Sequence, residues 1–194
     1  MISPNEIVCG ASASAQIEGY MFVILDSFCI ANVAFTGQNF GVKNVSNIKK
    51  CYWYSLIWIF IGWLFCLVII FSLYQPLLSI FINTKSEGII KDNAILAGFE
   101  RLRILTMTEM LNGWMDLNGS YLKGMKKSTA PAIVTAIGCT GTRILFLLTL
   151  FKTPTFHTIF WLYAAFPISW ILVNIVYIPI IIVIQKKQFK LLEV

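Results

Sequence analysis

The segment between residues 94 and 122 carries polar side chains at helical spacing within an otherwise apolar chain. At 100° per residue, five of them would fall within about 80° of one another on a helix. These five residues are Glu109, Asn112, Asp116, Ser120 and Lys123. Such a stripe is typical of an ion or substrate pathway, and its alternative is a set of buried polar contacts that fix helix packing. We predict that Glu109, Asn112 and Asp116 handle cations, protons or substrate.

Three more charged residues in apolar surroundings, Glu18, Asp26 and Arg143, are predicted to belong to the same pathway. Counted at 1.5 Å per residue from the basic ends of their helices, Asp26 and Asp116 lie at depths of about 15 and 12 Å. Arg143 and Glu109 lie at about 21 and 22 Å on the same count. These depths predict that the two aspartates share a proton or a sodium ion, and that Arg143 forms an ion pair with Glu109.

The residues that enzyme chemistry would need are missing from the sequence. His157 is the only histidine, so an H-E-x-x-H zinc site and a serine–histidine pair at membrane depth are both excluded. The 5 cysteines are scattered, with no C-x-x-C pair, and are interpreted as free packing thiols. We therefore expect no enzyme activity, no catalytic or metal-binding residue and no cofactor.

The composition indicates an integral membrane protein. Hydrophobic residues make up 58% of the chain and charged residues 12%, with a mean hydropathy of +0.77. This is too apolar for a soluble domain of 194 residues to cover with polar surface. The net charge of +6 comes from lysines in the connections between apolar segments, so it favours a membrane topology signal over nucleic-acid binding.

Apolar segments of sufficient length predict an all-α polytopic membrane protein with about five transmembrane helices. The chain is predicted to form one membrane domain, residues 1–194. The expected helices are residues 6–36, 47–82, 87–124, 129–152 and 157–185. The first and third of these would insert poorly alone, because a charge at the helix centre costs about 2.5–3.5 kcal/mol. Their polar side chains are therefore expected to face other helices or a water-filled cavity.

Five alternating spans place three lysine clusters on one side of the membrane. The clusters are Lys43, Lys49 and Lys50; Lys123, Lys126 and Lys127; and Lys186, Lys187 and Lys190. Positive charge favours the cytoplasmic side, which predicts a multi-pass protein with the N-terminus outside and the C-terminus in the cytoplasm. The membrane is expected to be the plasma (inner) membrane. A first span that starts outside suggests that an upstream part is missing or separately encoded. On that span Ala11, Ala15 and Gly19 form a ridge of small residues, predicted to allow close helix approach.

Three motifs resemble one transporter family in the correct order. The run GQNFGVKN at residues 37–44, followed by IKKC, resembles the segment after the eighth helix of the multidrug and toxic compound extrusion (MATE) transporters. The run NGSYLKGMKKSTAP at residues 118–131 is similar to the segment joining that family's helices ten and eleven. The run YAAFPISW at residues 163–170 is similar to its last helix.

The resemblance implies a secondary antiporter that exports drugs or other organic cations in exchange for Na⁺ or H⁺. It assigns this chain most of one six-helix lobe, the equivalent of helices eight to twelve. The N-terminal lobe and helix seven are expected as partners from elsewhere, along with the lipid bilayer and a small organic cation as substrate. The fragment alone is expected to be inactive, because such transporters form their path between two lobes.

The motif after the eighth helix is interpreted as a turn at the membrane surface rather than a substrate contact. Its signature residues are Gly37, Gln38, Asn39 and Gly41, and the glycines are expected to permit the turn. The sequence departs from the family pattern in two places, since Val42 stands where alanine is usual and Lys123 where arginine is usual. Asn112 matches the place where some members carry a cation-binding aspartate.

Two alternatives remain open on the sequence. The chain could be a non-transporting structural remnant or an assembly partner in the membrane. It could also belong to a transporter whose substrate is lipid-linked or metabolic.

Overall fold

The computed structural model describes residues 3–82 and 89–192, and these contain helices and no β-strand. The helical elements are α1 (Pro4–Gly41), α2 (Val45–Phe81), α3 (Ile89–Gly124), α4 (Thr129–Thr135), the π-helical turn η1 (Ala136–Gly141), α5 (Thr142–Leu148), the 3₁₀ turn η2 (Leu150–Lys152) and α6 (Ile159–Leu192). The all-α fold class is as predicted. The start of the predicted span 87–124 and the ends of the predicted domain 1–194 lie outside the described residues.

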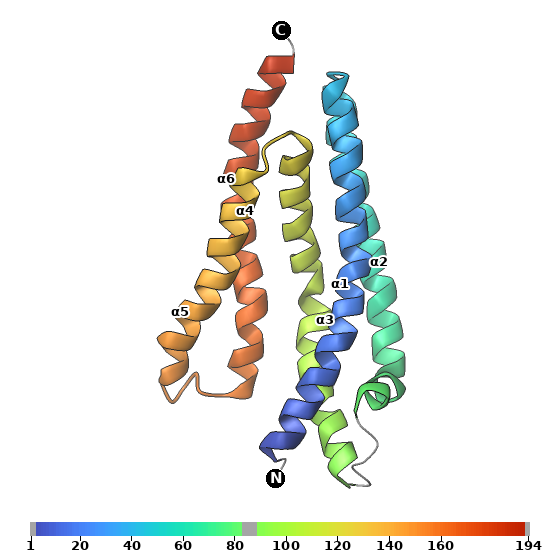
Figure 1. Cartoon of the computed structure of the whole chain (residues 1–194), viewed down its shortest axis with the longest axis vertical. Helices are drawn as coiled ribbons and strands as arrows, with labels where there is room; N and C mark the ends of the chain where they lie inside the picture. The colour runs from blue at the N-terminus through green and yellow to red at the C-terminus, as the bar shows by residue number, and fades with distance from the viewer. Residues whose placement is uncertain (1–2, 83–88, 193–194) are drawn as a thin grey trace.

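The long helices run side by side along one axis (Figure 1). Of the described residues, four segments are long and apolar enough to cross a membrane: Pro4–Gly41, Val45–Phe81, Thr129–Lys152 and Ile159–Leu192. Helix α3 is less apolar, yet it runs through the middle of the bundle and packs against α1, α2 and α6. Two of its charged residues, Arg101 and Glu109, are buried against neighbouring helices, as expected for a polar helix in a membrane bundle, whereas Glu100, Arg103 and Lys123 are exposed.

Glycine allows α1 and α3 to approach closely. A Cβ on Gly10 would lie 2.6 Å from the backbone nitrogen of Gly98, and a Cβ on Gly124 would lie 2.6 Å from Cβ of Thr36. The predicted ridge of Ala11, Ala15 and Gly19 does not make this contact: Ala15 and Gly19 are exposed, and a Cβ on Gly19 would meet nothing within 4 Å among the described residues. Small residues do bring α1 and α3 together, but on the face of α1 opposite Gly19.

The apolar side chains lie both in the core and on the outside of the bundle. One buried cluster joins α1 and α2 to α3 through residues such as Leu25 and Ile59, and a second joins α3 to α6 through Met115 and Val173. Large apolar side chains such as Phe65 are exposed on the outer faces. In a membrane protein such apolar outer faces are suited to contact with lipid.

The connections at one end of the bundle carry the three lysine clusters. The α1–α2 turn, the α3–α4 turn and the C-terminal end of α6 lie at this end, opposite the N-terminus (Figure 1). We call it the lysine end. In both turns a lysine adopts the left-handed conformation, with φ of 56° at Lys43 and 60° at Lys126.

Candidate functional site

The polar stripe predicted on α3 points mostly into the bundle. Glu109 and Asn112 are buried, as is Ser120. Asp116 is half-buried and Lys123 is exposed near the lysine end. The structure thus places the predicted residues along a polar face that begins in the interior and ends at the surface.

Glu109 has a carboxylate oxygen with no hydrogen-bond partner among the described residues. Its side chain is 1% exposed, and Oε1 accepts a 2.7 Å hydrogen bond from Asn112 Nδ2. The other oxygen, Oε2, is buried without a partner, and one turn earlier the Thr106 hydroxyl is buried in the same condition. A buried acceptor left unpaired costs about 1–3 kcal/mol, more when charged. The arrangement therefore favours a proton or a bound cation at Glu109.

Unlike Glu109, Glu18 forms an ion pair. Its Oε2 lies 2.6 Å from an Arg101 nitrogen, and another Arg101 nitrogen donates a 3.0 Å hydrogen bond to Ser14 Oγ. The Arg101 guanidinium also lies 5.9 Å from the centre of the Tyr163 ring. Glu18, predicted as a pathway residue, thus joins α1 to α3. Sequence reasoning missed this pairing, although Glu18 and Arg101 lie equally many residues before the ends of α1 and α3.

The predicted ion pair between Arg143 and Glu109 does not form. Among the described residues, Arg143 has no carboxylate within salt-bridge distance, and its Nε donates a 3.1 Å hydrogen bond to Ser169 Oγ. Its guanidinium carbon lies 4.2 Å from the centre of the Phe166 ring. Matching depth places two residues at one level but leaves open which helix faces which. Arg143 therefore binds α6 and not α3.

Asp26 on α1 and Asp116 on α3 are both half-buried. Of the described side chains, none forms a hydrogen bond with either aspartate, and no three His, Cys, Asp or Glu residues are placed to hold a metal ion. The shared proton or sodium ion stays a prediction.

A hydrogen-bond network that the sequence did not predict crosses from α2 to α6. Tyr52 Oη donates a 2.7 Å bond to Asn118 Oδ1 and accepts a 3.0 Å bond from Trp114 Nε1. Asn118 Nδ2 in turn donates a 2.9 Å bond to Asn174 Oδ1. Tyr52 and Trp114 lie in apolar segments whose local pattern does not indicate a hydrogen-bond partner, so only the asparagine at position 118 signalled a buried polar contact.

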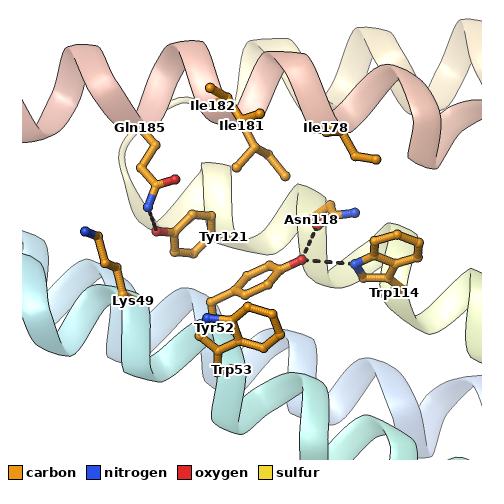
Figure 2. Close-up of a pocket in the computed structure, with 10 residues that line it drawn as sticks. All are labelled: Lys49, Tyr52, Trp53, Trp114, Asn118, Tyr121, Ile178, Ile181, Ile182 and Gln185. Carbon is orange, nitrogen blue, oxygen red and sulfur yellow. Dashed lines mark hydrogen bonds between the residues drawn. The ribbon is translucent and has the colours of Figure 1, made fainter.

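Part of this network lines a groove of about 300 Å³ between α2, α3 and α6, which we call the aromatic groove (Figure 2). Its lining residues are Lys49, Tyr52, Trp53, Trp114, Asn118, Tyr121, Ile178, Ile181, Ile182 and Gln185. Lys49 and Gln185 lie at the end nearer the lysine end, and Trp114 and Ile178 lie deeper along the helices.

The signature motif was predicted to follow a first helix that ends at residue 36. In the structure α1 continues to Gly41, so the four signature residues lie within its last turns. These residues are Gly37, Gln38, Asn39 and Gly41. The Asn39 amide donates a 2.8 Å hydrogen bond to a carbonyl one turn earlier, so it stabilises its own helix. The expectation that the glycines permit the turn is wrong, because Lys43 carries the left-handed conformation. The following helix begins with Asn44, whose side chain accepts a 3.0 Å bond from the backbone nitrogen of Asn47.

The polar face and the signature motif lie in a region that one protein family covers. The MatE family model matches residues 2–149, which include α1 to α5 and end before α6. Neither the curated proteins nor the solved structures give a match to the chain. The resemblance of residues 163–170 to the last MATE helix stays a prediction, since these residues lie beyond the matched range. The matched range covers most of the chain, which therefore belongs to the MatE family of membrane transporters.

Proposed function

We propose that the chain takes part in cation-coupled efflux, in which drugs or other organic cations leave the cell in exchange for Na⁺ or H⁺. The observation that carries the proposal is Oε2 of Glu109, which lies in the interior of the bundle and has no partner in the part of the chain that the structure describes. A buried carboxylate with a free oxygen binds a proton or a cation more readily than one held in an ion pair. Asn112 holds the other oxygen and so fixes the direction in which Oε2 points.

The remaining polar residues are given supporting roles. Asp116 and Asp26 lie farther along α3 and α1 towards the lysine end, where they would pass the coupling ion between Glu109 and the surface. Glu18 and Arg101 would hold α1 against α3 while the site fills and empties. Arg143, stacked on Phe166, would fix α5 against α6. No catalytic step and no cofactor beyond the coupling ion is part of this proposal.

Further helices are proposed as partners, namely the N-terminal lobe and the seventh helix that the family resemblance implies. The support comes from α1, where the exposed face includes Ser12, Ala15, Gln16 and Gly19. A polar, small-residue face in a membrane helix favours contact with another helix over contact with lipid. The chain alone is then expected not to transport. The proposed setting is the plasma (inner) membrane, with the N-terminus outside and the C-terminus in the cytoplasm.

Transport in proteoliposomes tests the proposal. The chain would be reconstituted with and without a co-expressed N-terminal lobe and seventh helix, and ethidium flux measured under Na⁺ and pH gradients imposed separately. We expect flux only with the partner helices, and Glu109→Gln should lower the gradient-driven flux at least tenfold. Glu100→Gln is the matched control, because Glu100 is an exposed residue of α3 paired with Arg103.

Three outcomes would contradict the proposal. Gradient-driven flux that survives Glu109→Gln would remove the role of that residue. Flux that survives Asp26→Asn combined with Asp116→Asn would remove the relay. The absence of flux with every partner would favour a structural role or a lipid-linked substrate.

A further inference from the structure

The aromatic groove has one apolar end and one polar end. Towards the middle of the bundle it is walled by Ile178 and Trp114, and the polar atoms nearby are already paired. Tyr52 Oη both donates and accepts a hydrogen bond, and Asn118 is bonded on both of its polar atoms. This deeper end therefore has no free group for a polar ligand and suits a hydrocarbon chain.

Polar groups at the other end are available. Tyr121 Oη accepts a 3.3 Å bond from Gln185 Nε2, while its own proton has no acceptor among the described residues. Lys49 is exposed, and its Nζ lies 5.3 Å from the centre of the Phe189 ring, so it reaches from α2 to α6 across the mouth of the groove. Neither group is paired with a described carboxylate. The mouth thus offers a positive charge and a hydroxyl donor.

The surroundings of the groove add positive charge and access from the lipid. Lys186 and Lys187 directly follow Gln185 on α6, and none of the residues that line the groove is acidic. Ile178 and Ile182 are each 47% exposed, so this wall of the groove opens to the side of the bundle and not to its centre. A molecule already in the bilayer can enter laterally.

We propose that the aromatic groove binds one anionic phospholipid, with the phosphate at Lys49 and Tyr121 and an acyl chain along the isoleucines of α6. Basic pockets between transmembrane helices are suited to anionic headgroups, and each lysine near a lipid surface strengthens that attraction. The site is separate from the polar face of α3 and requires no transport step.

Native mass spectrometry of the full chain in detergent tests this site, using phosphatidylglycerol and phosphatidylcholine with identical acyl chains as probes. We expect the anionic lipid to bind about fivefold more tightly, and Lys49→Gln to abolish this preference. Lys127→Gln is the matched control, because it removes the same charge at the lysine end but outside the groove, and the preference should persist.

A second pair of variants tests the apolar end. Ile178→Gln should weaken binding of both lipids, whereas Ile175→Gln, on an exposed position of α6 outside the groove, should leave binding unchanged. Equal affinity for the two lipids would overturn the proposal. So would equal effects of Lys49→Gln and Lys127→Gln, which would indicate diffuse attraction. A lipid-free dimer would assign the groove to a second copy of the chain. Because no transport is measured, a failure here is distinct from a failure of the proposed function.

Discussion

Glu18 and Glu109 are carboxylates on neighbouring helices of the same bundle, yet their surroundings differ. Glu18 lies 2.6 Å from Arg101, which also binds Ser14. Glu109 is more deeply buried and has a single amide partner, with one oxygen left free. The Glu18 carboxylate is neutralised by the Arg101 guanidinium. The Glu109 carboxylate has no cationic partner among the described residues, so a proton or a cation would stabilise it. The first region holds α1 against α3, and the second is where we propose that the coupling ion binds.

The largest expected effect comes from breaking the paired region. Arg101→Met removes the only positive partner of Glu18 among the described residues, and leaving a buried charge unpaired costs about 3–5 kcal/mol of unfolding free energy. Unfolding in mixed micelles with increasing SDS measures this loss. Arg103→Met is the control, because Arg103 forms an exposed pair worth under about 1 kcal/mol. Adding Glu18→Gln to Arg101→Met should restore most of the stability; failure to do so would show that the pair is not the cause.

An intermediate loss of unfolding free energy is expected from a substitution that separates α1 from α3, the helices that carry Glu18 and Glu109. Gly10→Ala places a Cβ against the backbone of Ala94 and Gly98, so α1 must move away from α3. Overpacking of this kind costs about 1–3 kcal/mol. The same unfolding assay measures it, with Gly19→Ala as a matched control on the open face of α1, where alanine should be neutral or stabilising by up to about 1 kcal/mol. Equal behaviour of the two variants would show that α1 does not depend on this contact.

The smallest effect on stability is expected at Glu109. Glu109→Gln keeps the shape of the side chain and removes the charge, so the unfolding free energy should change by less than about 1 kcal/mol or rise. Glu18→Gln has the opposite effect, since it strands Arg101 and should cost several kcal/mol. The unfolding free energies of the two single variants are measured in parallel in the same SDS assay. If Glu109→Gln lowered the unfolding free energy as much as Glu18→Gln, both residues would serve to stabilise the fold, and the comparison would fail.

Much of the fold follows from the sequence, because helix length and apolarity depend on local composition. The apolar runs predicted the membrane helices, and the polar spacing on α3 predicted that Glu109 and Asn112 share a face. The helix contacts were harder to predict. The ridge at Ala15 and Gly19 satisfied the small-residue pattern as well as Gly10 did, and only packing against Gly98 separates the two faces.

The sequence predicted the depth of the candidate site residues in the bundle but not all of their partners. Depth along a helix comes directly from residue counting, but the direction in which a side chain points depends on its neighbours. Arg143 therefore pairs with Ser169 on α6 instead of Glu109, and Arg101 supplies the ion pair that was expected elsewhere. The aromatic groove depends on Tyr52 from α2 meeting Asn118 from α3, a long-range contact that no local pattern encodes.

The two left-handed lysines have a consequence for how the topology is maintained. Lys43 and Lys126 each occupy a backbone conformation that costs a residue with a Cβ about 1–2 kcal/mol, and glycine would adopt it without that cost. Both positions carry a positive charge at the same end of the bundle. Glycine at either position would relieve the backbone strain, but it would also remove a positive charge from the lysine end, and such charges influence the orientation of a membrane protein. The two turns thus give up local backbone stability for a charge that helps to fix how the chain enters the membrane.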